Sequence, residues 1–503
     1  MKKRILALAL VAILAIGLLA ACGGDDPAPA PGNGSGDSPD GLSAVELKFQ
    51  VIGWGGPGDA EMARLSAAVN AHLSTLNKPY TVDIIFGEGG DYTDRTNLML
   101  ASGGNEFDII FISNWAANFF GNAAAGYLTD LRPYLAKYPE VERILTSDFM
   151  NASQVNGVNY ALPTNKEKAR SMGWVFREDI VEAMGMNLAE IEALPYSERA
   201  AALEPWFYKA KEEHNLWIWP NFITTDYQFD RIIEPTINSR VEPGATQAIV
   251  ADFEPEFMNA VKQNSKWFAD GLLNPDLTIQ SSGDEEFATG RYFGITYQLK
   301  PGKDKELESA IAGDFGFVQL VMNQPEIANS ETTGAMLAIP HGATNKDEAF
   351  DFISLLYTDK VMINTVIWGT EGHDFEFVGD GVIEFLDGGW SYGHGWTMGD
   401  QFKNYLTSAE DPTKWDQFIA FNEAGRPLPL LGFVPDTSDT EMQTWMAGVY
   451  AVREMYWDLF QGYYALDQVD AAFDRLRSEY ETAGMNELLA KVQEQIDAWL
   501  ATQ

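Results

Sequence analysis

The sequence predicts an α/β protein that folds as two lobes. From residue 47 onward, short β-rich runs alternate with helical patterns, and this order builds a parallel sheet with right-handed crossovers. A second α/β unit begins near residue 174, with a strand and then a helix. Roughly 460 residues follow the N-terminal segments, which is too many for one ordinary hydrophobic core and suits two.

Residues 1–21 have the form of a secretory signal peptide. Met1–Arg4 carries the positive charges, and Ile5–Ala21 is an almost unbroken apolar run. This run is shorter than the roughly 20 residues that span a bilayer comfortably, which makes an uncleaved transmembrane helix the weaker interpretation. Leu19–Gly23 then matches the lipobox of bacterial lipoproteins, and this match predicts lipidation of Cys22. The protein is therefore expected on the extracytoplasmic face of a bacterial membrane.

Residues 22–43 are predicted to be the lipidated cysteine followed by a disordered tether. The segment consists mostly of Gly, Asp, Pro, Ala and Ser, so it buries too little apolar surface to offset the entropy of ordering itself. Because Cys22 is the single cysteine, no internal disulfide can form. Signal removal takes away three basic residues and changes the net charge from −39 to −42, which disfavours nucleic acid and anionic lipid surfaces as partners.

The first lobe is predicted to start with a β-α-β-α-β unit. Its strands are expected at 47–52, 81–86 and 108–113, and its helices at 59–73, with Asp59 as the cap, and at 93–101. Open parallel sheets bind ligands beyond the carboxyl ends of their strands. These predicted ends carry Trp54 with Gly55, Glu88 with Tyr92, and Asn114 with Trp115.

Later segments extend both lobes. Strands are expected at 157–163, 174–176 and 335–340, and helices at 179–184 and 347–357. Near the C-terminus, apolar residues at helical spacing predict two packing helices, 466–480 and 488–500, with Gly484 between them.

Several ordered segments resemble the family-1 extracellular solute-binding proteins, in particular their large saccharide-uptake lipoprotein branch. Besides the lipobox, the segments that carry the likeness are Leu100–Phe111, Gly126–Leu131, Leu162–Glu167, Leu355–Lys360, Trp368–Phe375 and Leu430–Ser438. The chain departs from that family at Trp368, where a tyrosine is expected, and this departure leaves the detailed ligand open.

The resemblance implies a periplasmic-binding-protein-like fold, in which crossing segments join two α/β lobes that close on a ligand by a hinge. On this basis the first lobe is expected to comprise 44–163 and 322–372, and the second lobe 164–321 and 373–503, including a helical extension. The resemblance also implies a monomer with neither catalytic residues nor a cofactor, which binds an oligosaccharide or related polar solute. Permease subunits and a separate ATPase of an ABC importer would then be its partners, and no P-loop motif occurs in this chain.

Sugar binding needs aromatic faces and planar polar groups near one cleft. Trp54 and Trp115 are the leading stacking candidates, although either could instead fill a lobe core. Asn165, Lys166 and Glu167 follow Pro163 at the first expected crossing, where they either face the cleft or form a hinge salt bridge. Glu371 and His373 are further candidates, although a surface turn would also explain them. The weaker candidates are Trp219 with Tyr227, Tyr297, and the stretch that ends at Trp396.

Other functions fit the sequence less well. Gly53–Gly58 satisfies a dinucleotide-binding pattern, but Trp54 and Pro57 crowd the turn, and the acid Glu88 lies too far along the chain. A lipid-anchored glycoside hydrolase is the main enzyme alternative, because aromatic clefts and carboxylate pairs serve those enzymes too. The five histidines show no metal-ligand spacing, so no metal site is predicted, although calcium binding stays open in so acidic a chain.

Overall fold

The computed structural model describes residues 45–54, 56–220, 228–233, 235–277, 283–311 and 315–502. The expected signal peptide, the tether with Cys22, Gly55 and Tyr227 lie outside the described residues. None of the described helices is both long enough and apolar enough to cross a membrane.

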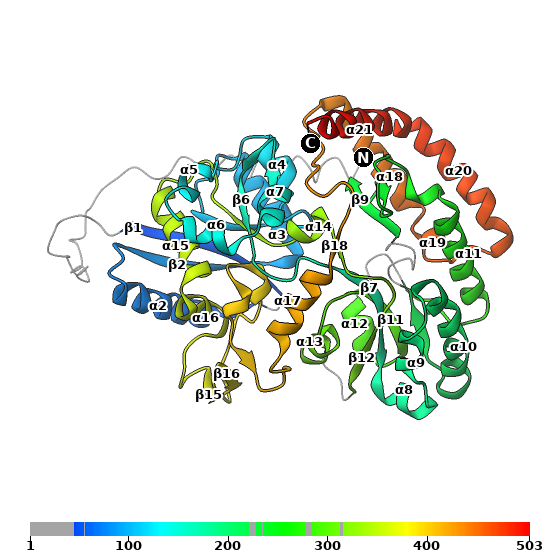
Figure 1. Cartoon of the computed structure of the whole chain (residues 1–503), viewed down its shortest axis with the longest axis horizontal. Helices are drawn as coiled ribbons and strands as arrows, with labels where there is room; N and C mark the ends of the chain where they lie inside the picture. The colour runs from blue at the N-terminus through cyan, green and yellow to red at the C-terminus, as the bar shows by residue number, and fades with distance from the viewer. Residues whose placement is uncertain are drawn as a thin grey trace, which may run out of the picture. The chain divides into compact units, whose positions relative to one another are not determined.

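The first lobe is built on a five-stranded sheet (Figure 1). Its strands follow the order β2-β1-β3-β14-β6, in which β1 pairs in parallel with both β2 and β3, while β14 runs antiparallel to β3 and β6. Their bounds are β1 Val45–Gly53, β2 Tyr80–Glu88, β3 Ile109–Ile112, β6 Ala161–Pro163 and β14 Met336–Ala338. The sheet is fully buried at its centre, which explains the continuous apolar run of β3.

Helices cover this sheet and complete the first core. α2 (Asp59–Thr75) and α16 (Lys360–Trp368) lie side by side, and α2 buries Met62, Leu65 and Val69 against β1 and β2. The other elements of this lobe are α3 Gly89–Ala101, α4 Phe119–Ala124, α5 Arg132–Leu135, α6 Pro139–Ile144, α7 Ser147–Ala152, β4 Gln154–Val155, β5 Val158–Asn159 and α15 Lys346–Thr358.

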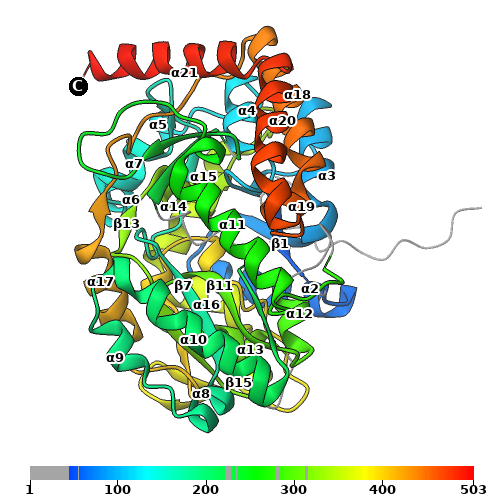
Figure 2. The ribbon, with the colours of Figure 1, turned by 90° about the vertical axis from the view of Figure 1, so that its right-hand side faces the viewer.

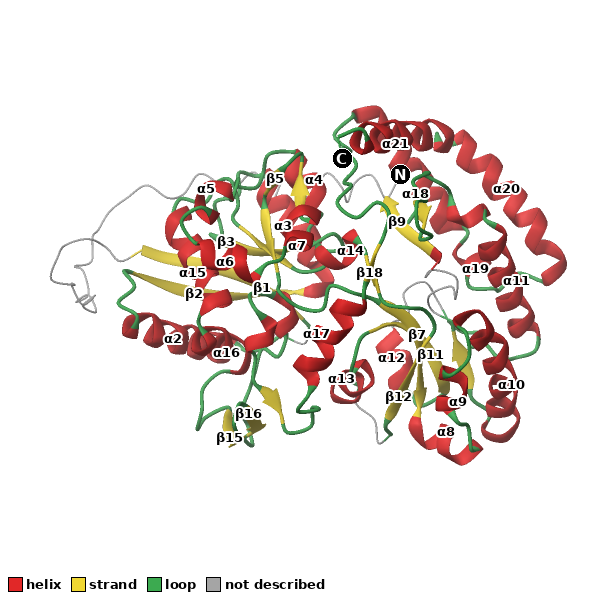
Figure 3. Ribbon diagram, in the orientation of Figure 1, coloured by secondary structure: helices red, strands yellow, loops and turns green. Residues whose placement is uncertain are grey.

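The second lobe has a four-stranded sheet of order β12-β7-β11-β8, with helices on its outer side (Figure 3). β7 runs antiparallel to β11 and β12, whereas β8 is parallel to β11. The bounds are β7 Ser171–Arg177, α8 Glu178–Met184, α9 Leu188–Glu192, α10 Tyr196–His214, β8 Trp217–Trp219, α11 Pro255–Ala269, α12 Gly283–Ala288, β11 Tyr292–Leu299, α13 Lys303–Ala310 and β12 Phe317–Val321.

A third hydrophobic core joins the C-terminal helices to a two-stranded ribbon. The ribbon consists of β9 (Phe229–Ile233) and β10 (Ile237–Arg240). Figure 2 shows α18 and α20 side by side, and α21 turns away from α20 where Gly484 adopts a positive φ of 95°. The helices are α18 Thr440–Met455, α19 Trp457–Phe460, α20 Val469–Thr482 and α21 Met485–Leu500, and the 3-10 turns η2 Ala251–Phe253 and η5 Leu466–Gln468 precede α11 and α20.

Short elements connect these cores. β13 (Glu326–Ile327) pairs with β18 (Arg426–Pro427), and α14 (Asn329–Thr332) follows β13. The remaining elements are β15 Phe375–Gly379, β16 Val382–Phe385, η3 Gly395–Thr397, η4 Gln401–Lys403, β17 Leu406–Thr407 and α17 Lys414–Ala424.

Most of the predicted strands and helices are confirmed, with small changes at their ends. Asp59 is the first residue of α2 and makes no side-chain cap, because Gly58 holds the cap position. α3 begins at Gly89, four residues before the predicted start at 93. The predicted β-α-β-α-β unit is parallel, as expected, and the sheet becomes mixed because β14, whose direction was not predicted, adds to it antiparallel.

The expected boundary at residue 373 does not coincide with the observed packing. Tyr392 and Met398 belong to the core of the first lobe. The Tyr392 hydroxyl donates to the carbonyl of Ile52 at 2.5 Å, and the Asp400 amide donates to the carbonyl of Leu356 at 3.1 Å. Residues 390–400 therefore pack with the first lobe, because their aromatic and apolar side chains fill its core.

Candidate functional site

The carboxyl ends of β1 and β3 bring two tryptophans together. The strands are parallel neighbours, with Phe49 opposite Ile109, so the residues that follow them emerge at the same edge of the sheet. Trp54 follows β1 directly, and Trp115 follows β3 after a short turn. Their rings stack with centroids 6.2 Å apart and planes inclined by 19°. Both side chains remain about half exposed, at 49% and 48%, so their outer faces are available to a ligand.

Other aromatic rings support this pair from the side of the protein. Phe111 lies 5.8 Å from Trp115, Trp396 lies 6.1 Å from Trp115, and His394 lies 5.8 Å from Trp54, as measured between centroids. The Trp115 indole Nε1 donates to the carbonyl of Gly334 at 2.7 Å, which fixes the orientation of the ring. We call Trp54, Trp115, His394 and Trp396 the aromatic platform.

The platform carries little charge and faces the second lobe. Burial lowers the pKa of His394 below its usual value, so this imidazole is neutral near pH 7. The charge of Glu306, on α13 of the second lobe, acts on the same pKa in the opposite direction. A neutral aromatic surface favours an uncharged ligand with apolar ring faces.

Gly89 makes room for the Trp54 indole. A Cβ atom at residue 89 would lie 2.3 Å from the Trp54 Nε1 atom, which is far closer than non-bonded atoms approach. At Gly90, a Cβ atom would meet nothing within 4 Å. The first residue of α3 is therefore constrained by the position of the platform.

The residues expected at the first crossing form a buried ion-pair network. Lys166 Nζ lies 3.0 Å from Glu167 Oε1, and Lys300 Nζ, from the end of β11, lies 3.2 Å from the same oxygen. Burial by itself would raise the pKa of Glu167, but the two ammonium groups lower it to about 2. Asn165 donates from Nδ2 to Asp400 at 2.8 Å. These residues tie the crossing segment to both lobes, as the salt-bridge alternative anticipated.

Several other predicted site residues do not reach the platform. Tyr92 is buried and donates its hydroxyl to the carbonyl of Phe111 at 2.8 Å, because it fills the space under the sheet edge. Trp219 is buried against Tyr292, which makes it a packing residue in this structure. Tyr297 is half-buried, with the Lys303 ammonium 5.8 Å from its ring centroid.

The remaining candidates differ in their surroundings. Glu88 is exposed and holds the N-cap position of α3 without a side-chain cap, and its carboxylate lies near Gly56 in the loop after Trp54. Glu371 and His373 lie in an exposed turn beside Asp374, which Arg64 of α2 binds at 2.6 Å. This turn contributes nothing to the aromatic platform.

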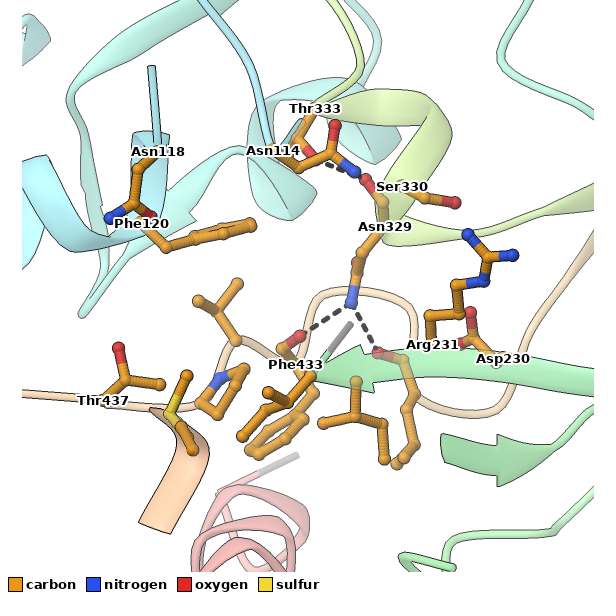
Figure 4. A pocket seen from close by; sticks show the side chains of 16 residues that line it. Asn114, Asn118, Phe120, Asp230, Arg231, Asn329, Ser330, Thr333, Phe433 and Thr437 are labelled. Atoms are coloured by element: carbon orange, nitrogen blue, oxygen red, sulfur yellow. Dashed lines mark hydrogen bonds between the residues drawn. The ribbon is translucent and has the colours of Figure 1, made fainter. Parts of the chain in front are cut away.

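A pocket of about 190 Å³ is lined in part by Asn114, the residue before Trp115 (Figure 4). Asn118 and Phe120 lie on one side of it, and Asp230 and Arg231 of β9 lie on the opposite side. Asn329 donates from its amide to the carbonyls of Leu430 and Phe433, at 3.2 and 2.7 Å, and so holds the C-terminal segment in the wall. Sequence reasoning found only Asn114 among the lining residues, since the others come from distant segments without a common pattern.

Asp230 is the most unusual group in this pocket. It is 2% exposed, and its Oδ1 atom has no hydrogen-bond partner. Burial is the main cause that raises its pKa to about 6, against an opposing effect of Arg170. A buried carboxylate without a full set of partners destabilises the folded chain at neutral pH.

No group of three or more His, Cys, Asp or Glu side chains is placed to hold a metal ion within the part of the chain that the structure describes. The arrangement is suited to binding through ring stacking and hydrogen bonds.

A family model now decides the class of protein. The model for bacterial extracellular solute-binding proteins matches residues 57–363, which is more than half of the chain. The chain belongs to this family. A second model, a domain of unknown function called DUF3502, matches residues 429–501 and so covers the C-terminal helices of this solute-binding protein.

Known proteins agree with this assignment. A carbohydrate ABC transporter substrate-binding protein of Streptococcus pneumoniae is 24% identical over 450 residues, covering 88% of this chain and 87% of that protein. The crystal structure of an N-glycan transport solute-binding protein from Streptococcus pneumoniae superposes with a TM-score of 0.78 at 20% identity, covering 91% of this chain and 99% of that one. An extracellular solute-binding protein from Bifidobacterium longum subsp. infantis gives a TM-score of 0.59 at 13% identity, over 90% and 98% of the two chains. The predicted two-lobe periplasmic-binding-protein-like fold is confirmed.

Replacing Gly89 with alanine tests the geometry of the platform. We expect Gly89→Ala to displace the Trp54 indole and to weaken the exciton signal of the Trp54–Trp115 pair in circular dichroism. The free energy of unfolding should change by less than about 1 kcal/mol, because the clash involves the movable end of an exposed side chain. Gly90→Ala is the matched control and should leave the spectrum unchanged. Identical spectra for both variants would contradict the observed stacking.

Replacing Asp230 with asparagine tests its burial. The folded-state pKa of about 6 exceeds the value of about 3.8 for an unperturbed aspartate, so ionised Asp230 disfavours folding above about pH 6, and this cost disappears below about pH 4. We expect Asp230→Asn to raise the free energy of unfolding by roughly 1–3 kcal/mol at about pH 7.5, and by much less at about pH 4. Urea denaturation at both pH values measures this difference. Asp94→Asn, on the exposed face of α3, is the control, and an equal effect of both substitutions would refute the assignment.

Proposed function

We propose that this solute-binding protein binds a neutral oligosaccharide and delivers it to an ABC importer. The observation that carries the proposal is the half-exposed stack of Trp54 on Trp115 at the carboxyl edge of the first sheet. Indole faces stack on the C–H-rich faces of sugar rings, and open sheets of this kind bind ligands at this edge. The inner sides of the two rings pack against the protein, and their exposed halves offer an apolar surface that a ligand can cover.

The relatives support the same substrate class. The curated relative from Streptococcus pneumoniae is a carbohydrate ABC transporter substrate-binding protein. The N-glycan transport protein of that organism, whose fold this chain shares, has been solved with Man1GlcNAc and with Man5GlcNAc. These saccharides are the natural first probes for the present chain.

Lobe closure would couple binding to transport. In this proposal the ligand rests on the platform of the first lobe and also contacts the second lobe. A ligand that contacts both lobes has a higher affinity for the closed form and therefore shifts the population toward it. Permease subunits would recognise the closed form, and a separate ATPase would supply the energy.

The lipobox at Cys22 supports a location at the extracytoplasmic face of the cell membrane, where acyl chains would anchor the protein. The tether to residue 43 would leave the two lobes free to reach the permease. We further infer that the protein releases its ligand unchanged, because its family is defined by solute binding.

Isothermal titration of the mature chain with Man1GlcNAc, Man5GlcNAc, kestose and fructo-nystose tests the proposal. Trp54→Ala and Trp115→Ala should each lower the affinity for the bound saccharide by about 10- to 100-fold, because each removes half of the stacking surface. Tyr450→Ala, an equally exposed aromatic on α18, is the matched control and should bind like the wild type.

Two results would overturn the proposal. Failure of the wild type to bind any of these saccharides would reject the substrate class. Chromatography of the recovered ligand would detect cleavage of the saccharide. A cleaved saccharide would favour the glycoside hydrolase instead.

A further inference from the structure

The pocket is linked to the platform through two pairs of residues that are adjacent in the chain. Asn114 lines the pocket, and Trp115 belongs to the platform. Thr333 lines the pocket, and the carbonyl of the next residue, Gly334, orients Trp115. The backbone N–H of Asn114 donates to the carbonyl of Thr333 at 3.1 Å, and this hydrogen bond holds the two pairs of residues together. This junction is the route by which a chain-like ligand on Trp115 would extend toward the pocket.

The lining of the pocket suits a sugar unit. Phe120, Ile232 and Met446 provide apolar surface, while Ser330 and Thr437 provide hydroxyl groups. A compact polar ring with one apolar face matches such a mixed wall. Asn329 is fully engaged, since it also accepts from the Gly432 amide at 2.8 Å, and it acts as part of the wall.

Two acceptor oxygens at the pocket lack donors. These are Oδ1 of Asn114 and Oδ1 of Asp230, both of which are buried. A buried acceptor without a donor costs free energy, and a ligand hydroxyl would remove that cost. The missing partners are thus hydrogen-bond donors.

The charges around Asp230 disfavour an acidic ligand. Arg170 lowers the pKa of Asp230, whereas Glu326 and Glu331 raise it, and Arg231 lines the same side of the pocket. Arg170 is already held by the Ser330 hydroxyl and the Phe229 carbonyl, at 3.3 and 3.5 Å, and Glu326 is paired with Arg426 at 2.6 Å. A ligand carboxylate would meet the carboxylate of Asp230 in a poorly solvated space, which is unfavourable.

We propose that this pocket is a subsite that holds one neutral sugar unit of the bound oligosaccharide, whose hydroxyl groups donate to Asp230 and Asn114. This inference rests on the proposed saccharide-binding function and adds to it the place and the chemistry of the unit next to the platform. The subsite would favour sugar units with hydroxyl donors over sugar acids.

Filling the pocket tests the subsite. Thr437→Trp places a large side chain at the pocket wall, and Ser438→Trp places the same group at the exposed neighbouring residue as the control. The probes are two pairs of short and long saccharides, Man1GlcNAc with Man5GlcNAc and kestose with fructo-nystose. We consider the pair that the wild type binds. Thr437→Trp should lower the affinity for the longer saccharide at least tenfold and the affinity for the shorter saccharide less than twofold. Ser438→Trp should change neither affinity.

A pH series provides a readout that does not depend on the shape of the pocket. A hydroxyl bonds more strongly to the ionised form of Asp230, so binding is favoured above its pKa of about 6 and weakens below it. The wild type should lose several-fold affinity for the longer saccharide between about pH 7.5 and pH 5, and Asp230→Asn should lose much less. Because Glu326 and Glu331 remain in that variant, the difference between the two proteins reports Asp230.

The outcomes separate the two proposals. If the wild type binds a longer saccharide and Thr437→Trp leaves its affinity unchanged, the subsite is wrong and the saccharide-binding function stands. The subsite would also be overturned if Asp230→Asn, compared with the wild type, lost more affinity for an oligouronate than for a neutral saccharide. If the wild type binds none of the four saccharides, the proposed function fails, and the subsite fails with it.

Discussion

The parallel pairing of β1 with both β2 and β3 is the constraint on which the rest of the site depends. The register sets Phe49 opposite Ile109 and ends β1 opposite the end of β2. Because parallel strands leave the sheet at one edge, Trp54 and Trp115 meet there although they are distant in sequence. A shift of one residue in this register would exchange the side chains on the two faces of β1 and separate the two rings.

Several residues around the site lower the stability of the free protein. The platform leaves two large indoles half exposed, and Asp230 keeps a carboxylate buried with an oxygen that has no donor. Each arrangement is unfavourable in the free protein, and under the proposed function a sugar that covers the rings and supplies hydroxyl groups would offset this cost. Glu167 differs in that its Oε1 atom is ion-paired with two lysines, although its Oε2 atom also has no hydrogen-bond partner.

The sequence predicted the first lobe well because its signals are local. Alternation at Leu47, Phe49 and Val51 marks a strand, and the rule for open parallel sheets then indicates Trp54 and Trp115. Whether a given aromatic lies in a cleft or in a core is not a local property, which explains why Tyr92 and Trp219 were expected at the ligand and are buried. Segment 390–400 was placed in the wrong lobe for the same reason, since Tyr392 reaches back to the carbonyl of Ile52. The pocket could not be predicted, because residues from β9, α14 and the segment after Leu430 converge on it only in the folded chain.

The crystal structure of the mature chain with a bound neutral oligosaccharide tests the central claim most directly. The account predicts that the C–H face of one sugar ring lies in van der Waals contact with Trp54 or Trp115, between the two sheets. A saccharide bound elsewhere, with both indoles still exposed to solvent, would contradict it.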